Sequence, residues 1–339
     1  MTTSSAPGKI ILFGEHAVVY GRPALAVPVT QVHADVEIAD SSRAGIWIDA
    51  PDVDLHAELN TLPSDHPLAS VIHNFLFLSR TSPSPSGRGA RGEGGFPDLE
   101  IKITSTIPVA AGLGSGAAVT VALTRALSMH LDIPMTDEEV NAFAYEIEKL
   151  HHGTPSGIDN TVITYAKPVY FIKGNPIETF SVGKPFTIVI GDTGIPAPTK
   201  ESVSDVRRLW ESDKEKWERV FDKVGNIAEE ARSAIESGKS RQAAAPDAGS
   251  TRWRRRRSWN LLGEWMNENH RLLQQMTVSS PELDALVSAA RNAGALGAKM
   301  SGGGRGGNMI ALVEDRNAQA VASALKQAGA PRTVITQIS

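Results

Sequence analysis

The chain has 339 residues, of which 41% are hydrophobic and 21% are charged, and its formal net charge is −4. The length favours two domains, and so small a net charge gives no electrostatic footprint for nucleic acid or an anionic membrane. The sequence contains no cysteine, which excludes disulfides and thiolate metal sites. The start, MTTSSAPGK, lacks the pattern of a secretory signal, and no apolar run approaches the roughly 20 residues of a membrane helix. We therefore expect a cytoplasmic protein with no membrane segment.

The first third of the chain is rich in short β-prone runs separated by turn residues. These runs predict strands over 9–13, 24–29, 34–38 and 99–104. A 3–4 spacing of apolar residues predicts a helix over 65–80. The segment 81–95, TSPSPSGRGARGEGG, has almost no apolar side chains and is predicted to be a mobile loop.

The middle of the chain alternates helices with glycine-containing loops. The segment AGLGSGAA at 111–118 follows a strand and leads into an apolar, alanine-rich helix. Thr136 and Glu139 have the spacing of a capping box, which predicts the start of the next helix. After that helix come a loop, GTPSGID, at 153–159, and further predicted strands over 169–172 and 186–190.

From Lys200 onward the pattern is that of long helices. Apolar residues recur at 3–4 spacing from Trp217 to Ile235, and Gly238 predicts the end of that helix. The remaining predicted elements are helices over 261–275, 280–293 and 317–328 and strands over 309–313 and 332–337. We place the domain division between residues 185 and 186. The stretch 239–258 contains five arginines within 252–257, and we interpret it as a flexible, solvated loop rather than a phosphate-binding patch.

The segment AGLGSGAA has three interpretations: an anion cradle, a dinucleotide fingerprint, or a tight turn into a packed helix. A glycine-rich loop between a strand and a helix exposes backbone N–H groups at a helix N-terminus, which suits a phosphate. A tight turn explains one glycine but not three and a serine. Gly112, Gly114 and Ala117 match G-x-G-x-x-A, but no strand ending in an acidic residue follows at the required distance. A phosphate cradle is favoured, and the Ser115 hydroxyl can reach a metal bound to that phosphate.

Phosphoryl transfer needs further groups, namely a magnesium carboxylate, a cation near the γ-phosphate and a group that orients the acceptor. Glu148, at the edge of a helical apolar stripe, is a candidate for the first. Lys9, before an apolar strand, is a candidate for the second, and Asp159, in a Pro/Gly loop, for the third. Each residue taken singly also has an ordinary structural explanation, respectively a surface glutamate, an exposed strand-end lysine and a local cap. Their presence together with two glycine-rich loops favours the chemical interpretation.

Three stretches of the chain form a further pattern: APGKIILFGEHAVVYG at 6–21, IPVAAGLGSGAA at 107–118 and KMSGGGRGGNMIAL at 299–312. Together they resemble the motifs of the GHMP small-molecule kinases, which are named for galactokinase, homoserine, mevalonate and phosphomevalonate kinases. GEHAVVYG, HHGTPSGIDN at 151–160 and GDTG at 191–194 are similar to the branch that acts on mevalonate. The resemblance implies an α+β, two-domain fold. The N-terminal domain (1–185) would contain a left-handed βαβ unit, the C-terminal domain (186–339) would be ferredoxin-like, and ATP would lie between them.

The implied reaction is the ATP- and Mg²⁺-dependent phosphorylation of the C5 primary hydroxyl of mevalonate, in isoprenoid biosynthesis. Asp159 would orient or deprotonate the acceptor hydroxyl, and Lys9 would neutralise charge on the transferred phosphoryl group. Magnesium would be held by Glu148 and Ser115. The nucleotide loop would comprise Ala111, Gly112, Leu113, Gly114, Ser115, Gly116 and Ala117. The substrate side would comprise Glu15, His16, Thr193, Gly302 and Gly303. A homodimer is implied by analogy with the family.

Two positions depart from the family pattern. Gly116 stands where many of these kinases have a second serine. Either Ser115 supplies the missing hydroxyl, or this hydroxyl ligand is absent. Arg305 stands where a small residue is common, and it either contacts a phosphate or points to water. The alternatives in the family are a phosphomevalonate kinase and the related decarboxylases, which generally lack the lysine at the position of Lys9. A non-catalytic sensor of ATP and a metabolite is the alternative from another class.

Overall fold

The computed structural model describes residues 1–81, 97–108, 111–152, 155–238 and 258–339. These residues form two compact units. Unit 1 comprises Met1–Gly8, Val32–Val109 and Gly114–Ala166, and unit 2 comprises Lys9–Gln31, Ala110–Leu113 and Lys167–Ser339. The units are therefore interleaved along the sequence, and the division expected between residues 185 and 186 remains a prediction.

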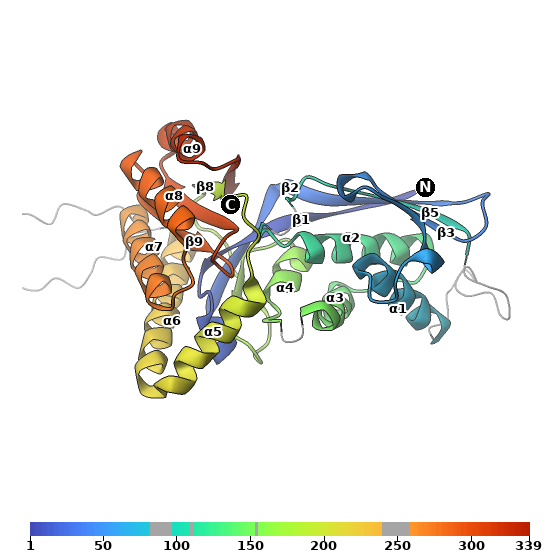
Figure 1. Ribbon diagram of the computed structural model, residues 1–339, viewed down its shortest axis with the longest axis horizontal. Coiled ribbons are helices and arrows are strands. Elements are labelled where there is room, and N and C mark those ends of the chain that lie inside the picture. Colours follow the sequence, from blue (N-terminus) through green and yellow to red (C-terminus); the bar gives the residue numbers. More distant parts are fainter. Residues whose placement is uncertain (82–96, 109–110, 153–154, 239–257) are drawn as a thin grey trace, which may run out of the picture. The chain divides into compact units, whose positions relative to one another are not determined.

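Unit 1 is a sheet with helices along one face (Figure 1). Its strands are the first part of β1 (Thr2–Phe13), the second part of β2 (Ala24–Asp40), β3 (Ile46–Ala50), β4 (Leu55–Glu58) and β5 (Leu99–Ser105). β5 pairs antiparallel with β2 and parallel with β3, and β3 pairs antiparallel with β4. Because α1 (Pro67–Thr81) lies in the connection between the parallel strands β3 and β5, this part of the chain is a βαβ unit.

The other helices of unit 1 pack on one another beneath this sheet. They are α2 (Ser115–His130), α3 (Asp137–His152) and α4 (Ile158–Tyr165). The capping box at the start of α3 is confirmed, since the Thr136 N–H donates to Glu139 Oε2 at 2.7 Å and the Glu139 N–H donates to Thr136 Oγ1 at 3.2 Å. Alternating burial of β5, with its leucine and isoleucines inward, confirms the half-buried strand.

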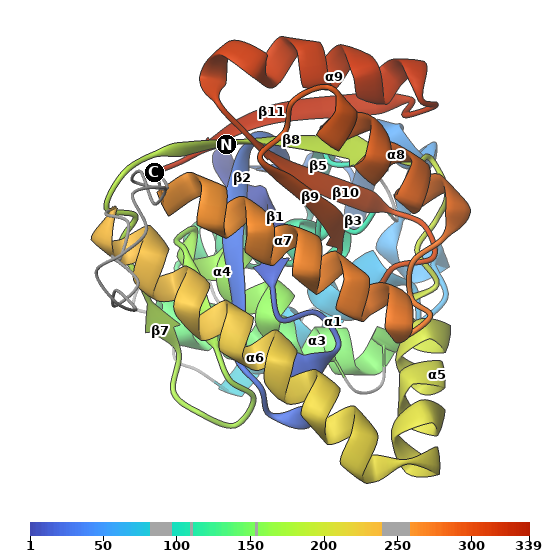
Figure 2. The same cartoon turned by 90° about the vertical axis from the view of Figure 1, so that its left-hand side faces the viewer.

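Unit 2 is built on a four-stranded antiparallel sheet in the order β11-β8-β10-β9 (Figure 2). Its strands are β8 (Phe186–Asp192), β9 (Gly297–Ser301), β10 (Asn308–Val313) and β11 (Arg332–Ile338). Every residue of β8, β9 and β10 is buried. The first residues of β2 pair with β6 (Val169–Phe171), which pairs with the short β7 (Glu178–Thr179).

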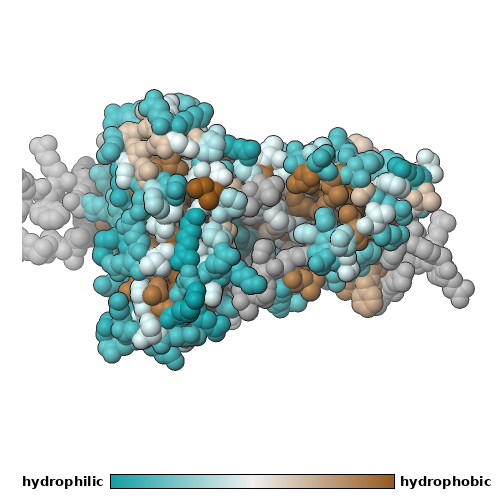
Figure 3. Space-filling model, in the orientation of Figure 1, coloured by the Kyte–Doolittle hydropathy of each residue, from teal (hydrophilic) through white to brown (hydrophobic). Residues whose placement is uncertain are grey.

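In the described part of unit 2, five helices follow β8 in the chain. They are α5 (Thr199–Ser212), α6 (Lys214–Ser237), α7 (Ser258–Gln275), α8 (Pro281–Asn292) and α9 (Ala318–Gln327). α7 and α8 pack on β9, α9 packs on β8 and β11, and α6 packs on α7. α6 ends at Gly238, whose φ of 56° is left-handed, as its sequence predicted. Figure 3 shows a mainly hydrophilic surface over α5 and α6, consistent with helices that bury only one face.

Several predicted boundaries were wrong. The two strands expected over 24–29 and 34–38 are one continuous strand, β2, because Thr30 and Gln31 continue its extended backbone. Strand β9 was not predicted, and the short strands β3 and β4 carried too weak an alternation to be predicted. The loops expected over 81–95 and 239–258 fall, apart from Thr81 in α1 and Ser258 in α7, outside the described residues.

Candidate active site

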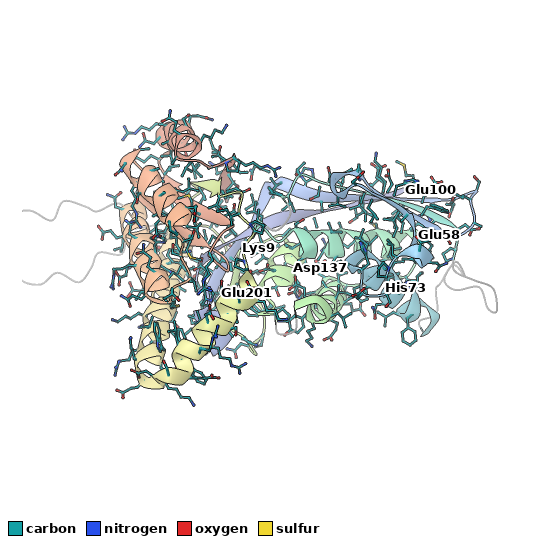
Figure 4. All side chains as sticks on the ribbon, viewed as in Figure 1. Lys9, Glu58, His73, Glu100, Asp137 and Glu201 are labelled. Atoms are coloured by element: carbon teal, nitrogen blue, oxygen red, sulfur yellow. The ribbon has the colours of Figure 1, made fainter. Side chains whose placement is uncertain are left out.

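Lys9 lies on the part of β1 that belongs to unit 2 (Figure 4). Its side chain is almost completely buried, with 3% exposure. Its backbone N–H donates to the Leu113 carbonyl at 2.9 Å, which joins the first motif to the start of the second. A buried lysine amine keeps its charge only when nearby groups compensate it. Its burial excludes the alternative of an exposed strand-end lysine, and its functional role remains a prediction.

The third motif adjoins both of the others within unit 2. Ser301, at the end of β9, bonds to Ile11 twice: the Ile11 N–H donates to its Oγ at 3.1 Å, and its Oγ donates to the Ile11 carbonyl at 2.9 Å. At the start of β10, the Asn308 side-chain amide donates to the Ala111 carbonyl. Segments separated by as many as 290 positions in the sequence are thus held side by side by polar contacts.

Glu15 and His16 follow β1 and are both buried. The Lys299 ammonium donates to Glu15 Oε1, and His16 Nε2 donates to the Gly303 carbonyl at 3.1 Å. Burial lowers the pKa of His16 to about 4, so that its ring is neutral at physiological pH. Because Nε2 carries the proton, Nδ1 is an acceptor. Within the described part of the chain, His16 Nδ1 and Glu15 Oε2 have no hydrogen-bond partner, so each can accept a hydrogen bond from a ligand hydroxyl.

The glycines after β9 form a loop that tolerates little side-chain volume. Gly304 has a φ of 80°, and a Cβ there would lie 1.9 Å from the Val278 carbonyl oxygen. A Cβ at Gly303 would lie 2.5 Å from Thr199 Oγ1, at the start of α5. Thr193 reaches the same loop, since its N–H and its Oγ1 donate to the Gly307 carbonyl at 2.9 and 2.8 Å.

Arg305 neither extends to open water nor is left free for a phosphate. Its guanidinium pairs with Asp205 of α5 at 2.5 Å, and its Nε donates to the Thr277 carbonyl at 3.1 Å. Hydrogen bonds from Arg305, and then from Arg208, lower the pKa of Asp205. The side chain instead ties the glycine loop to α5 and to the segment after α7.

In unit 1, the second half of the second motif forms the N-terminus of α2. Gly114 is the N-cap residue, with a φ of 77° that favours glycine, and its carbonyl accepts the Ala118 N–H at 2.9 Å. Ser115 and Gly116 begin the helix, the former half-buried and the latter exposed. The first N–H groups of a helix have no intrahelical acceptor and carry partial positive charge. The loop therefore has the backbone arrangement expected of a phosphate cradle.

Asp159 and Glu148 lie on neighbouring helices of unit 1. Asp159 occupies the first turn of α4, after Gly157. The next residue, Asn160, donates from its side-chain amide to Asn141 of α3, at 2.6 Å to Oδ1 and 3.2 Å to the carbonyl. Glu148 stands two helical turns after Asn141 and so shares the face of α3 that meets α4. Both carboxylates are half-buried.

The predicted site residues thus fall into two groups. Unit 2 contains Lys9, Glu15, His16, Ala111, Gly112, Leu113, Thr193, Gly302 and Gly303. Unit 1 contains Gly114, Ser115, Gly116, Ala117, Glu148 and Asp159. The roles assigned to them remain predictions. Sequence reasoning missed Lys299 and Asn308. A signal that could have identified Lys299 is its position between Ala298 and Met300, in an otherwise apolar run before the glycines.

The donor set suits magnesium better than a metal held by protein alone. Among the described residues, no three His, Asp or Glu side chains gather closely enough to hold a metal ion. Mg²⁺ takes oxygen ligands and is commonly bound by one or two carboxylates together with substrate phosphates. A glutamate on α3 and a serine hydroxyl at a phosphate-binding helix N-terminus fit that pattern. In the same described part, no helix is long and apolar enough to cross a membrane.

Comparisons with known proteins found two matching family models, several similar sequences and a similar solved structure. Residues 86–167 match the model of the GHMP kinases N terminal domain, and residues 254–331 match that of the GHMP kinases C terminal domain. A mevalonate kinase of Pyrococcus abyssi is 35% identical over 350 aligned residues, covering 100% of this chain and 96% of the relative. A mevalonate kinase of Thermococcus gammatolerans is also 35% identical, with 99% and 96% coverage. The crystal structure of L. major mevalonate kinase in complex with R-mevalonate superposes with a TM-score of 0.79 at 28% identity, covering 100% of this chain and 96% of that one.

Proposed function

Because the chain belongs to the GHMP kinase family, with the two-domain α+β fold of that family, we propose that it is a mevalonate kinase. It would transfer the γ-phosphoryl group of ATP to the C5 primary hydroxyl of mevalonate. The observation that carries this proposal is the convergence of all three motif segments within unit 2, through Lys9–Leu113, Ile11–Ser301 and Asn308–Ala111. The full-length identity to relatives named mevalonate kinase supports the same substrate.

In this proposal Asp159 orients or deprotonates the acceptor hydroxyl, and Lys9 stabilises negative charge on the transferred phosphoryl group. A buried cation is effective in this role because little solvent screens it. The buried acceptors His16 Nδ1 and Glu15 Oε2 would receive hydrogen bonds from the hydroxyl groups of the acceptor molecule. Thr193, Gly302 and Gly303 would bound the same side of the site. Backbone N–H groups of residues 111–117 would hold the phosphates of ATP.

Magnesium would be held by Glu148 and by the Ser115 hydroxyl, and when bound it neutralises charge on the phosphates. Since Gly116 offers no hydroxyl, we expect Ser115→Ala to raise the Mg²⁺ concentration at half-maximal rate. The measurement is an Mg²⁺ titration at saturating ATP, with Ser115→Thr as the variant that keeps the hydroxyl. An unchanged Mg²⁺ requirement in Ser115→Ala would remove Ser115 from the metal site.

A panel of acceptor alcohols in a coupled assay of ADP release tests the proposed function. The panel contains mevalonate, 5-phosphomevalonate, homoserine and galactose, each with ATP and Mg²⁺. We expect ADP release only with mevalonate. Release with phosphomevalonate alone would make the chain a phosphomevalonate kinase, and ATP binding without release for any acceptor would favour a sensor. A cytoplasmic location and a homodimer are further parts of the proposal, the latter tested by light scattering.

A further inference from the structure

Lys299 is a buried lysine that the proposed reaction does not use. It lies on β9 of unit 2, and neither its side chain nor that of Glu15 is exposed to solvent. Its ammonium donates to Glu15 Oε1 and to the Met300 carbonyl, the latter at 2.6 Å. Such a pair has a large desolvation cost, and a single unpaired charge left in that place would cost more. The chain therefore maintains two charges where apolar residues would suffice for packing.

The other charged groups around β9 do not compete for this pair. His270 of α7 accepts the Met300 N–H on Nδ1 at 3.4 Å and lies 3.2 Å from Asp284 of α8. Burial lowers the pKa of His270 to about 4, so that it is neutral at physiological pH. Arg291, also on α8, donates to the Ala298 carbonyl at 2.7 Å. Among the residues that the structure describes, Glu15 is the carboxylate that compensates Lys299.

Glu15 also acts electrostatically on Lys9. Burial raises the pKa of the Glu15 carboxyl, and Lys299 and, more weakly, Lys9 lower it. Coulombic coupling is mutual, so the ionised carboxylate attracts the Lys9 side chain as well. The same segment, 9–16, is held against β9 by the Ile11–Ser301 hydrogen bonds.

We propose that Lys299 is a positioning residue that acts through Glu15: it keeps the Glu15 carboxylate ionised and in place, and Glu15 in turn supports the charge of Lys9. This inference rests on the proposed function for its link to turnover. Without Lys299, Glu15 would be a buried carboxyl with no compensating ion pair, and its protonation would shift to higher pH. Lys9 would then lose its neighbouring negative charge over a pH range in which the natural protein retains it.

The experiment is the pH profile of kcat with ATP, Mg²⁺ and mevalonate for the natural protein and for Lys299→Met. Because the active form needs ionised Glu15, removing Lys299 moves the acid limb of the profile to higher pH by at least about one unit, a tenfold loss at a fixed pH on that limb. The KM for ATP should change by less than about twofold, because the proposed ATP contacts at residues 111–117 do not involve Lys299. An acid limb that superimposes on that of the natural protein overturns the proposal, as does a loss of equal size at every pH.

Three further variants separate the charge from the packing. Lys299→Arg keeps the charge and should keep the acid limb near its natural position, and a limb like that of Lys299→Met contradicts the proposal. Glu15→Gln should remove the contribution of Glu15 to the limb, and Lys299→Met should add no further shift in that background, because it acts through Glu15. An additional shift contradicts that dependence. The double variant leaves no unpaired buried charge, so it is informative even if Lys299→Met alone does not fold.

A titration of the Glu15 carboxyl, measured without any acceptor alcohol, tests this inference separately from the proposed function. In protein labelled with ¹³C at glutamate side-chain carboxyls, the Glu15 resonance is identified by its absence in Glu15→Gln. Its titration should move to higher pH in Lys299→Met. Absence of ADP release with mevalonate, together with this shift, refutes the proposed function but supports the ion pair. Normal activity with an unshifted Glu15 titration refutes the inference alone.

Discussion

Asp159 is the residue whose predicted role depends most on its own side chain. It lies in the first turn of α4, where a carboxylate is favourable for any helix, so its position alone does not distinguish a cap from a catalytic group. We expect Asp159→Ala to lower kcat by at least about 10²-fold, the size of general-base effects, while ATP binding measured by calorimetry persists.

The matched control for Asp159 is Asp137, which occupies the first turn of α3 in the same unit and pairs with Arg125. Asp137→Ala should remove a similar helix-terminal charge with little effect on kcat. Equal losses in the two variants would mean that the effect of Asp159 is a general one on helix stability.

Gly116 distinguishes a phosphate cradle from a bland helix start. It is the second residue of α2, it is exposed, and a Cβ there would meet nothing within 4 Å. We expect Gly116→Ala to raise the free energy of unfolding by about 0.5 kcal/mol, because alanine restricts the unfolded chain more than glycine does. If a phosphate approaches this backbone, the same variant should weaken ATP binding by at least about fivefold, or about 1 kcal/mol. Higher stability with unchanged ATP affinity would contradict phosphate binding at Gly116.

At the scale of elements, local pattern predicted those whose stabilising features lie near one another in the sequence. The capping box of α3, the glycine end of α6 and the alternating strand β5 are of this kind. Strand β9 was missed because it is held by β10, α7 and α8 rather than by any local preference. The residues of β9 carry no local strand signal, so that tertiary pairing decides their structure.

The candidate site could be predicted where its residues carry a local signal. Its long-range partners could not. Motif spacing identified Lys9, Asp159 and the glycine loops, because each has a distinctive local composition. The partners Lys299 and Asp205 were not found, because pairing with Glu15 and Arg305 depends on residues 284 and 100 positions away. No local signal specifies which distant charge a buried lysine will meet.

His270 couples α7 to β9 and α8, and its titration should be visible in stability. Burial lowers its pKa from 6.5 to about 4 in the folded state. Between these values the unfolded chain binds more protons than the folded protein, so the stabilisation is fully present above about pH 6.5 and is lost as the pH falls toward 4. The shift corresponds to at most about 3 kcal/mol.

We therefore expect His270→Gln to lose less free energy of unfolding than the natural protein between pH 7 and pH 4.5, as measured by urea denaturation. The control is His56→Gln, since His56 is exposed on β4. The pKa of His16 is also lowered by burial to about 4. His16 therefore contributes a separate loss of unfolding free energy at acid pH, and both variants retain this loss. Parallel losses in the natural protein and in His270→Gln would show that His270 is not titrating with unfolding.

At the scale of the whole molecule, the nucleotide loop itself passes from one unit to the other: Ala111–Leu113 belong to unit 2, and Gly114 begins the next segment of unit 1. A phosphate held by the backbone at the start of α2 engages unit 1, and a ligand that binds only the folded state stabilises what it engages. At 100 times its Kd, a non-hydrolysable ATP analogue with Mg²⁺ stabilises by about 2.7 kcal/mol. We expect hydrogen exchange to slow by up to about 100-fold in α2 of unit 1. Unchanged exchange in α2 would contradict the cradle as proposed.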